Sequence, residues 1–250
     1  MNSAAPARPV ALVADAGFYV GPPLARLLAT RGFDLALGDP SIGLADEVSE
    51  LGAAVVALEG CRDLAAPGSA QRLVDAALER FGRLDSAVAF SGRIVTGRFM
   101  RSSVEDFRTV MEGCMVAPYE FMKAVLPPMI EAQQGQVLVI TSASAARPTP
   151  GAPLYSAARA GATHLVRNVA DEVARHRVQV NAVGTNFMDF PEFRRANKVD
   201  EPGVLEKLEA MVPLGRLGTM EEFAHFCAPY LDGTSRFTTG QFTSYAGGWS

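Results

Sequence analysis

Three side chains follow one another at a spacing that suits proton transfer. Ser142 ends an apolar run, Tyr155 comes thirteen positions later, and Arg159 follows Tyr155 by four. On a helix, a tyrosine and an arginine four positions apart share one face and reach each other or a common ligand. A free tyrosine titrates near about 10, and a fixed positive charge beside it favours tyrosinate. The spacing predicts Tyr155 as a base, with Ser142 donating a hydrogen bond to a substrate oxygen.

The same spacing also fits a helix-surface arginine and a half-buried tyrosine that do no chemistry. The position of Ser142 makes this alternative weaker, because Ser142 directly follows the apolar run of residues 136–141. A residue at the end of a buried strand lies where ligands of parallel sheets bind. The loop between Ser142 and Tyr155 can bring the serine opposite the two helical side chains.

The segments that must position these residues alternate between strand-like and helix-like patterns. Apolar strand-like runs indicate parallel strands covered on both faces, and hence an α/β doubly wound sheet with helices on both faces. We expect about seven strands in a single domain spanning 1–250, with residues 1–8 as a flexible tail. Pro118 and the Pro127–Pro128 pair are expected to strain the longest helix. The expected strands are 10–15, 33–39, 53–58, 86–90, 136–142, 178–183 and 239–248; the expected helices are 22–31, 43–51, 68–81, about 103–132 and 152–175, with short helices in a loop over 184–230.

Ligands of such sheets bind outside the carboxyl ends of the strands. In this chain those ends are Ala14–Gly21, Phe90–Arg93, Ser142–Ser144 and Gly184–Met188. We therefore expect these four segments to surround the site.

Composition excludes several other classes of protein. The 250 residues carry a net charge of −4 with no basic run, which argues against nucleic acid and anionic membranes as partners. The three cysteines form no C-x-x-C pair and the three histidines no H-E-x-x-H spacing, so we expect neither disulfides nor a metal site. No stretch approaches the roughly 20 apolar residues that span a bilayer, and no secretory signal is evident. These features are typical of a cytoplasmic protein.

Longer strings resemble a known superfamily. The segment ITSASAARPTPGAPLYSAARAGATHLVRNVADEV is similar to the active-site segment of short-chain dehydrogenases/reductases, as are VQVNAVG, VPLGRLGTMEEFA and TGQFTSYAGGW. This resemblance covers nearly the whole chain and implies a Rossmann-like fold. In that superfamily a lysine follows the tyrosine by four residues and also binds the nicotinamide ribose. Here that position is Arg159.

The first turn also departs from the superfamily, whose form is roughly T-G-x-x-x-G-x-G. Asp15 and Tyr19 occupy two of the three glycine positions, and Pro22 and Pro23 remove N–H groups that a phosphate could use. Asp39, where an acidic residue would hold an adenosine ribose, is interpreted as a turn residue. Two further family marks are changed: N-N-A-G reads Ala89-Phe90-Ser91-Gly92, and the asparagine of the long helix is Cys114. These departures predict that no nicotinamide cofactor is bound.

Together the departures resemble one branch, the halohydrin dehalogenases. Its marks are the Ser–Tyr–Arg triad and an aromatic in a T-x-x-x-x-F/Y-x-G turn, which Tyr19 and Gly21 fit while Ala14 replaces the threonine. The resemblance implies that halide lies between that aromatic and the loop after the sixth strand. The expected halide and substrate residues are Tyr19, Thr185, Asn186, Phe187 and Met188, with backbone N–H groups of Phe187 and Met188 as donors and Phe190 and Phe193 as candidate wall residues.

The implied reaction turns a vicinal haloalcohol into an epoxide, releasing halide and a proton. In reverse, small anions such as azide, cyanide or nitrite open epoxides. Two alternatives stay open: an NAD(P)-dependent reductase with arginine in place of the catalytic lysine, and a non-enzymatic scaffold or binding protein. By resemblance only, we expect a homotetramer that pairs through the helices 103–132 and 152–175, with Trp249 able to reach a neighbouring site.

Overall fold

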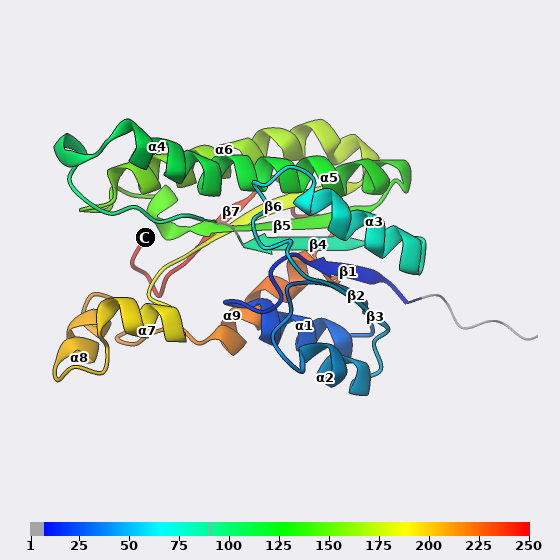
Figure 1. Cartoon of the computed structure of the whole chain (residues 1–250), viewed down its shortest axis with the longest axis horizontal. Helices are drawn as coiled ribbons and strands as arrows, with labels where there is room; N and C mark the ends of the chain where they lie inside the picture. The colour runs from blue at the N-terminus through cyan, green and yellow to red at the C-terminus, as the bar shows by residue number, and fades with distance from the viewer. Residues whose placement is uncertain (1–7, 91) are drawn as a thin grey trace, which may run out of the picture.

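A seven-stranded parallel sheet runs through the middle of the computed structural model, which describes residues 8–90 and 92–250 (Figure 1). Its strand order is β3-β2-β1-β4-β5-β6-β7, which confirms the expected Rossmann-like, doubly wound α/β class. The switch in strand order falls between β1 and β4, where ligands of such sheets bind. The strands are β1 (Val10–Val13), β2 (Asp34–Gly38), β3 (Val55–Leu58), β4 (Ser86–Phe90), β5 (Gly135–Ser142), β6 (Val178–Thr185) and β7 (Phe242–Tyr245).

The two longest strands carry the residues of interest to one edge. All eight residues of β5 are buried, as a strand covered on both faces requires. β5 and β6 pair along their whole length, from Gly135 beside Val178 to Ser142 beside Thr185. The sixth strand thus continues two residues beyond its expected end at 183, because each added residue pairs with one of β5.

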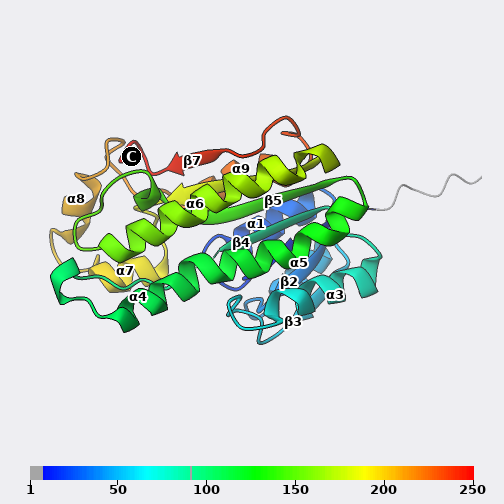
Figure 2. The ribbon, with the colours of Figure 1, turned by 90° about the horizontal axis from the view of Figure 1, so that it is seen from above.

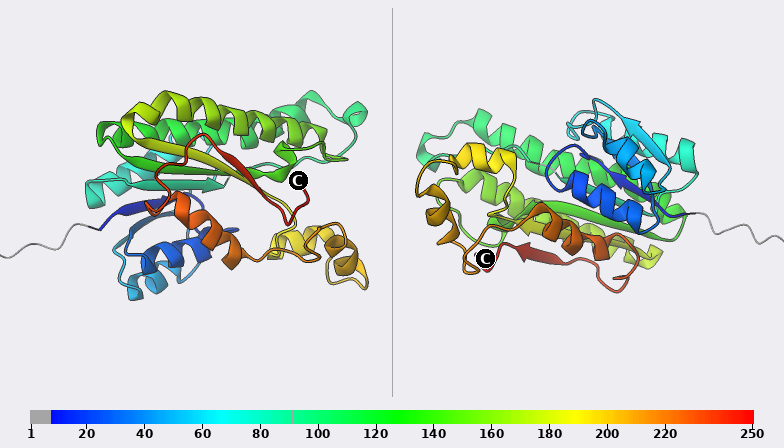
Figure 3. Two further views of the ribbon diagram at one scale, coloured as in Figure 1. Left: turned by 180° about the vertical axis from the view of Figure 1, so that it is seen from behind. Right: turned by 90° about the horizontal axis from the view of Figure 1, so that it is seen from below.

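Helices cover both faces of the sheet. α3 (Ser69–Phe81), α4 (Val104–Met111), α5 (Ala117–Glu131) and α6 (Pro153–Val173) lie on one face, as seen from above in Figure 2. The other face carries α1 (Gly21–Thr30), α2 (Leu44–Glu50) and α9 (Met220–Cys227), visible from below in Figure 3. α7 (Pro191–Asn197) and α8 (Val204–Glu209) project beyond the sheet after β6 (Figure 1). They are the short helices expected within 184–230.

Local sequence signals set several helix ends. α4 begins at a capping box in which Ser103 and Asp106 satisfy each other's backbone N–H groups, and Thr219 and Glu222 do the same for α9. α3 ends at Gly82, whose φ of 70° is left-handed and suits glycine. These terminal residues explain why the expected helix ranges lie close to the observed ones.

The long helical stretch expected over 103–132 is present as a continuous run over residues 104–131 whose hydrogen-bond pattern changes once. α4 and α5 are joined by a π-helical turn, Glu112–Val116, which contains the buried Cys114. Pro118 follows it and has no N–H to donate to an earlier turn, so the regular hydrogen-bond pattern fails here. Pro127 and Pro128, by contrast, lie inside α5 without ending it. The expected long helical stretch is therefore present, and the strain expected at Pro118 takes the form of a π-helical turn just before it.

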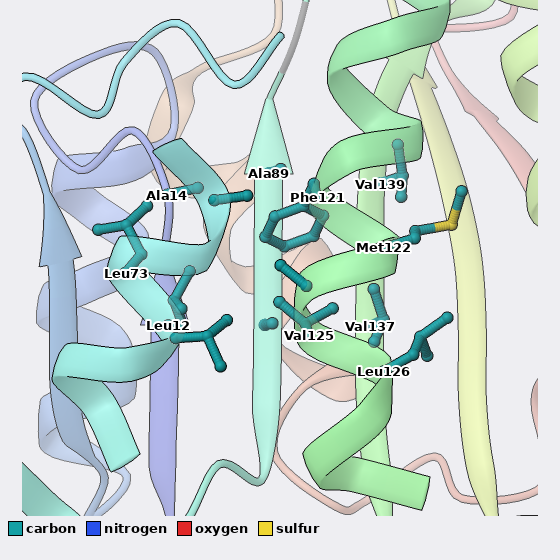
Figure 4. Close-up of a cluster of buried hydrophobic side chains, with 14 of the residues drawn as sticks. Leu12, Ala14, Leu73, Ala89, Phe121, Met122, Val125, Leu126, Val137 and Val139 are labelled. Carbon is teal, nitrogen blue, oxygen red and sulfur yellow. The ribbon is translucent and has the colours of Figure 1, made fainter. Parts of the chain in front are cut away.

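Two buried clusters hold the helices to the sheet. Figure 4 shows the cluster between the sheet and the helices α3 and α5, where Leu12, Leu73 and Phe121 meet. A side chain of this size stabilises the fold by roughly 1.5–3 kcal/mol when buried. The second cluster lies under α1 and α9 and includes Tyr19 and Phe223. Tyr19 is therefore part of the hydrophobic core as well as a candidate site residue.

Membrane spans, metal ligands and the N-terminal tail can each be compared with the described residues alone. Among residues 8–90 and 92–250, no helix is both long and apolar enough to cross a bilayer, and no three His, Cys, Asp or Glu side chains gather as metal ligands do. Residues 1–7 of the expected tail, and Ser91, lie outside the described residues. Arg8, the last residue of that tail, forms an ion pair with Asp34 at 3.1 Å.

Candidate active site

Ser142 is held at the carboxyl end of β5. Its side chain is buried, and its Oγ accepts hydrogen bonds from the Ser144 N–H at 3.2 Å and the Ser144 hydroxyl at 2.9 Å. The Ser142 hydroxyl itself donates to the Thr185 carbonyl at 3.4 Å, a long and weak bond. Its proton can therefore turn to a substrate oxygen without leaving a strong partner.

Tyr155 and Arg159 lie on the first turns of α6, as their spacing predicts. The Arg159 guanidinium carbon is 5.0 Å from the centroid of the Tyr155 ring, within the range of a cation–π contact. Arg159 is fully buried while Tyr155 is half-buried. A buried guanidinium keeps its charge, so it places a fixed positive charge against the phenol. α6 also packs against the 3-10 turn Ala143–Ala145, which directly follows Ser142.

Room for the Arg159 guanidinium is made by a glycine. A Cβ atom on Gly92 would lie 2.1 Å from Arg159 Nη2, so any larger residue there would force the guanidinium to move. Gly92 follows β4 in the sequence Ala89-Phe90-Ser91-Gly92 that replaces the usual family motif. The sequence motif alone does not indicate this contact, which depends on how the segment after β4 approaches α6 over the neighbouring strand β5.

Tyr19 faces the same edge from the first turn. Its hydroxyl donates to Thr185 Oγ1 at 2.8 Å. Its ring stacks on the Phe90 ring, with 4.6 Å between the centroids, and forms a T-shaped contact with the Phe190 ring, with 4.8 Å between the centroids. Burial raises the pKa of Tyr19 well above its usual range, with smaller effects from Thr185, Cys227, Tyr155 and Arg159. Tyr19 therefore stays a neutral phenol, and its pKa responds to the charges of the triad beside it.

The loop after β6 is only partly as expected. Thr185 is the acceptor for Tyr19, a role that the sequence did not reveal. The Phe187 N–H, expected to bind halide, donates to the Asn186 side-chain oxygen at 2.9 Å. A halide there has to displace this oxygen. Phe187 has a φ of 54°, a left-handed conformation that a bulky residue rarely adopts. Such strain marks functional turns.

The aromatic residues of this loop form a chain of ring contacts, in which Phe193 lies 6.2 Å from Phe190 and 6.5 Å from Phe187 between ring centroids. Phe190 joins Tyr19, whereas the Phe187 ring contacts Trp249 at 5.7 Å and Phe193 at 6.5 Å. Phe190 is therefore the wall residue at the first turn, and Phe187 contributes backbone only. Met188 packs against Gly218, where a Cβ atom would lie 2.9 Å from its Sδ.

Trp249 lies against its own chain in this structure. Arg147 covers the indole ring at 4.6 Å and also donates to the Trp249 carbonyl at 2.7 Å. Together with the Phe187 contact, these interactions hold the C-terminal segment over the loop that follows β6.

Two residues near the first turn lie in segments expected to surround the site, and a third, Arg62, lies outside them. Phe90 and Phe18 enclose the Tyr19 ring, with Phe18 at 5.7 Å from Phe90. Arg62 lies over the Phe18 ring at 4.8 Å and pairs with Asp15 at 3.3 Å. Phe90 is expected at the site from its place at a strand end, whereas the Arg62 contacts depend on a loop that the sequence pattern does not place.

The Asp15 carboxyl is buried in the first turn. Burial raises its pKa to about 6, against lowering by Arg62 and a further small increase from Asp39. Asp15, Phe18, Arg62 and Phe90 line a cavity of about 430 Å³ at the ends of β1 and β4. This cavity lies where the switch in strand order predicts a ligand.

The start of α1 offers little to an anion. The Gly21 N–H donates to the Phe18 carbonyl at 2.9 Å, Pro22 and Pro23 have none, and the Leu24 N–H donates to Val20 at 3.0 Å. A helix N-terminus binds phosphate through exactly such groups when they are unpaired, and here none of the four is available. The Asp39 carboxylate already has hydrogen-bond partners as well. It accepts hydrogen bonds from the Gly60 and Cys61 N–H groups at 2.6 and 2.8 Å.

Comparisons with known proteins identify the family. A family model described as Enoyl-(Acyl carrier protein) reductase matches residues 20–250, most of the chain. The chain therefore belongs to this family, within the short-chain dehydrogenase/reductase superfamily, whose members named in these comparisons are oxidoreductases.

Individual relatives agree with this assignment. The chain is 29% identical to 3-oxoacyl-[acyl-carrier-protein] reductase FabG of Vibrio cholerae over 254 residues, which covers 96% of each protein. It is similar to the crystal structure of acetoin dehydrogenase from Enterobacter cloacae, with a TM-score of 0.84, 27% identity, and coverage of 97% and 96%. The structure of ElxO with NADP bound has the same fold, with a TM-score of 0.86, 18% identity, and coverage of 97% and 98%.

These comparisons overturn the expectation that no cofactor is used. The relatives and structural neighbours are reductases or dehydrogenases, and ElxO is described with NADP bound, so they point to a nicotinamide cofactor. They also favour the NAD(P)-dependent reductase alternative over dehalogenation. The expectation rested on a few changed positions, in the first turn, in the segment ending at Gly92, at Cys114 and at Arg159, whereas the resemblance to reductases extends over nearly the whole chain.

The described first turn nevertheless does not fit a pyrophosphate in its present conformation. The Tyr19 ring closes the groove against Thr185, the Asp15 carboxylate is buried beside it, and the N–H groups of Gly21 and Leu24 are already paired. Binding of a nicotinamide nucleotide therefore requires Tyr19 to leave Thr185, or phosphate contacts other than the start of α1.

Proposed function

We propose that Ser142, Tyr155 and Arg159 form a halohydrin dehalogenase site that closes a vicinal haloalcohol to an epoxide. The observation that carries this proposal is the position of Tyr19. Its ring contacts the rings of Phe90 and Phe190, and its hydroxyl donates a hydrogen bond to Thr185 Oγ1. That arrangement builds an apolar, aromatic wall beside the triad at the edge of the sheet. Positive ring edges and backbone N–H groups in such a wall suit a departing halide.

The proposed step moves one proton and breaks one carbon–halogen bond. Tyr155, as tyrosinate beside the Arg159 charge, takes the proton of the substrate hydroxyl while Ser142 donates to the same oxygen. That oxygen attacks the neighbouring carbon from behind, and the halide leaves with the bonding electron pair. Nothing is oxidised or reduced. Holding the oxygen opposite the carbon–halogen bond is a positioning effect, and stabilising the halide is an electrostatic one.

The test is release of halide and proton from 1,3-dichloro-2-propanol by the purified protein. We expect release by the wild-type protein and by Tyr119→Phe, which changes an exposed tyrosine on α5. Tyr155→Phe should release none, because it lacks the ionisable group. If neither the wild-type protein nor the control releases halide from this substrate or from its bromo analogue, the proposal is wrong.

The second candidate is an NAD(P)-dependent reductase with Arg159 in place of lysine, and the comparisons favour it. The nicotinamide would supply hydride to a carbonyl carbon. Ser142 would hold the carbonyl oxygen, and Tyr155 would deliver the proton to it. Oxidation of NADH or NADPH with a small ketone such as acetoin, without halide release in the first assay, selects this candidate.

We also propose that the chain assembles through the face that carries α4 and α5. Val104, Phe107 and Tyr119 are large apolar or aromatic side chains exposed there, at 66%, 47% and 46%. An exposed apolar face of this kind marks a protein interface. Size-exclusion chromatography should give a dimer or tetramer for the wild-type protein and a smaller species for Phe107→Glu. A monomeric wild-type protein would contradict this.

A further inference from the structure

Ser144 lies two residues after Ser142, on the 3-10 turn Ala143–Ala145, and donates twice to the same oxygen. Its hydroxyl donates to Ser142 Oγ at 2.9 Å, and its backbone N–H donates to that oxygen at 3.2 Å. Ser144 is only 5% exposed, and among the described residues its hydroxyl forms no other hydrogen bond. The Ser144 hydroxyl therefore acts on Ser142 alone.

These two bonds decide what the Ser142 hydroxyl can do. A serine hydroxyl has one proton to donate and two positions at which it can accept. Ser144 occupies both accepting positions, so a substrate hydroxyl cannot donate to Ser142 Oγ. The Ser142 proton has only the long bond to the Thr185 carbonyl at 3.4 Å, and it can turn from there to a ligand.

The turn itself does not require the bond from the Ser144 hydroxyl. It is closed by the Ala146 N–H, which donates to the Ala143 carbonyl at 3.0 Å, and it is capped by Ser142, which accepts the Ser144 N–H. Ser144→Ala would keep both of these bonds. The bond from the Ser144 hydroxyl adds nothing to this backbone pattern, and it ends on the serine of the triad.

The direction of the Ser142 hydrogen bond matters in both candidate reactions. The substrate oxygen gains negative charge when a haloalcohol loses its proton or when a carbonyl accepts hydride, and a hydrogen-bond donor stabilises that charge. If Ser142 could accept, a haloalcohol could donate its hydrogen bond to Ser142 instead of to Tyr155, and the base could not remove the proton. Donation from Ser144 excludes that binding mode. It also strengthens Ser142 as a donor, because hydrogen bonds in a chain polarise one another.

We propose that Ser144 is a positioning residue that fixes Ser142 as a hydrogen-bond donor to the substrate oxygen. This inference rests on the proposed role of Ser142, and it holds for either candidate reaction. It also limits which ligands react. The substrate oxygen must accept from Ser142 and, when it carries a proton, direct that proton to Tyr155.

The test is steady-state kinetics of Ser144→Ala, which removes the hydroxyl and keeps the backbone N–H. On 1,3-dichloro-2-propanol, kcat should fall about three- to tenfold, the effect of one neutral hydrogen bond. KM should fall as well, because the haloalcohol can then also bind in the unreactive direction. With 2-butanone and NADPH, kcat should fall by the same factor at unchanged KM, since a ketone has no proton to donate. Whichever reaction the wild-type protein catalyses supplies the measurement.

Two further variants show whether the loss comes from the hydroxyl. Ser144→Thr is the rescue variant, since it restores a hydroxyl at the same position, and its kcat should return toward the wild-type value. Ser86→Ala is the matched control, because it removes a buried hydroxyl at the start of β4, at the other end of the sheet. The Ser86 Oγ has no hydrogen-bond partner among the described residues, so the kinetics of this control should equal those of the wild-type protein.

Ser142→Ala separates this inference from the proposed function. If Ser142→Ala is inactive while Ser144→Ala matches Ser86→Ala, Ser142 acts without Ser144 and this inference is wrong. A raised KM at unchanged kcat in Ser144→Ala would also overturn it, because that result assigns the hydroxyl to substrate contact or to local structure. Full activity in Ser142→Ala would instead overturn the proposed role of Ser142, and this inference with it.

Discussion

The two halves of the candidate site lie at one edge of the same sheet, yet they differ in how far they depart from the family pattern. The Ser142–Tyr155–Arg159 half, on β5 and α6, keeps two of the family residues and changes one lysine to arginine. The first-turn half, between β1 and α1, holds Tyr19 and Asp15 in place of glycines. The chemistry of proton transfer and the occupancy of the neighbouring groove can thus be changed separately.

The physical reason lies in what positions each half. Tyr155 and Arg159 are fixed by helix geometry and by packing of α6 on the sheet, which any core-preserving sequence retains. The first turn is fixed by short-range contacts, such as the Tyr19 hydroxyl on Thr185. A few substitutions refill this groove without moving the helix that carries the base. The predictions below act on one half at a time.

The largest effect is expected from removing the base. Tyr155→Phe should reduce turnover by about 10²–10⁴-fold or more, the usual contribution of a general acid or base. Both candidate functions require this result, so the measurement is made with haloalcohol and with ketone plus NADPH. Circular dichroism should show an unchanged fold. Full activity in either assay would remove Tyr155 from the mechanism of that reaction.

Arg159→Lys separates the two functions. The planar guanidinium lies on the Tyr155 ring and against Gly92, whereas an ammonium group can approach the ring but is not planar and directs its donors differently. Halide release should fall about 10–100-fold, an effect of about 1.4–2.7 kcal/mol at about 1.36 kcal/mol per factor of ten. Under the reductase candidate, the same change restores the family spacing and should raise NADPH oxidation. Steady-state kinetics on both substrates distinguish these outcomes.

Tyr19→Gly opens the first-turn groove. Glycine accepts the φ of 54° without strain, and loss of the ring leaves space between Phe90 and Phe190. Affinity for NADPH should rise about tenfold, while unfolding stability should fall by about 3–5 kcal/mol, as for other large buried aromatics. Tyr19→Phe is the control, since it removes only the bond to Thr185, at a cost of about 1 kcal/mol. If NADPH binds the wild-type protein as tightly as Tyr19→Gly, the ring does not obstruct the groove.

Asp15→Asn has the smallest expected effect, seen in the pH dependence of stability. Burial raises the Asp15 pKa from 3.8 to about 6, so the folded state binds a proton that the unfolded state releases. Stability from this group is full below pH 4 and is lost as pH rises toward about 6 and beyond. Relative to wild type, the asparagine variant should gain about 1–2 kcal/mol between pH 4 and pH 7. Urea unfolding at several pH values measures this, and parallel curves for the two proteins would contradict it.

Sequence reasoning performed best where the signal is periodic and local. The buried strands, the ends of α3 and α4, and the shared helical face of Tyr155 and Arg159 all follow from patterns of a few residues. It found the long helical stretch but not the form of its internal change, and it performed worst on the cofactor. Pro118 indicated strain, but not that the change would be a π turn through Cys114. The cofactor expectation gave the first turn more weight than the superfamily resemblance of the rest of the chain.

The amino-acid sequence by itself determined the class of fold, the order of the elements and the side chains able to move a proton. These depend on side-chain periods of two and 3.6 residues and on capping groups, which are local properties. Only the tertiary structure decided that Tyr19 bonds to Thr185, that Phe190 rather than Phe187 completes the aromatic wall, and that Gly92 makes room for Arg159. These contacts join segments far apart in the chain, and their geometry is set by how helices and strands pack rather than by neighbours in sequence.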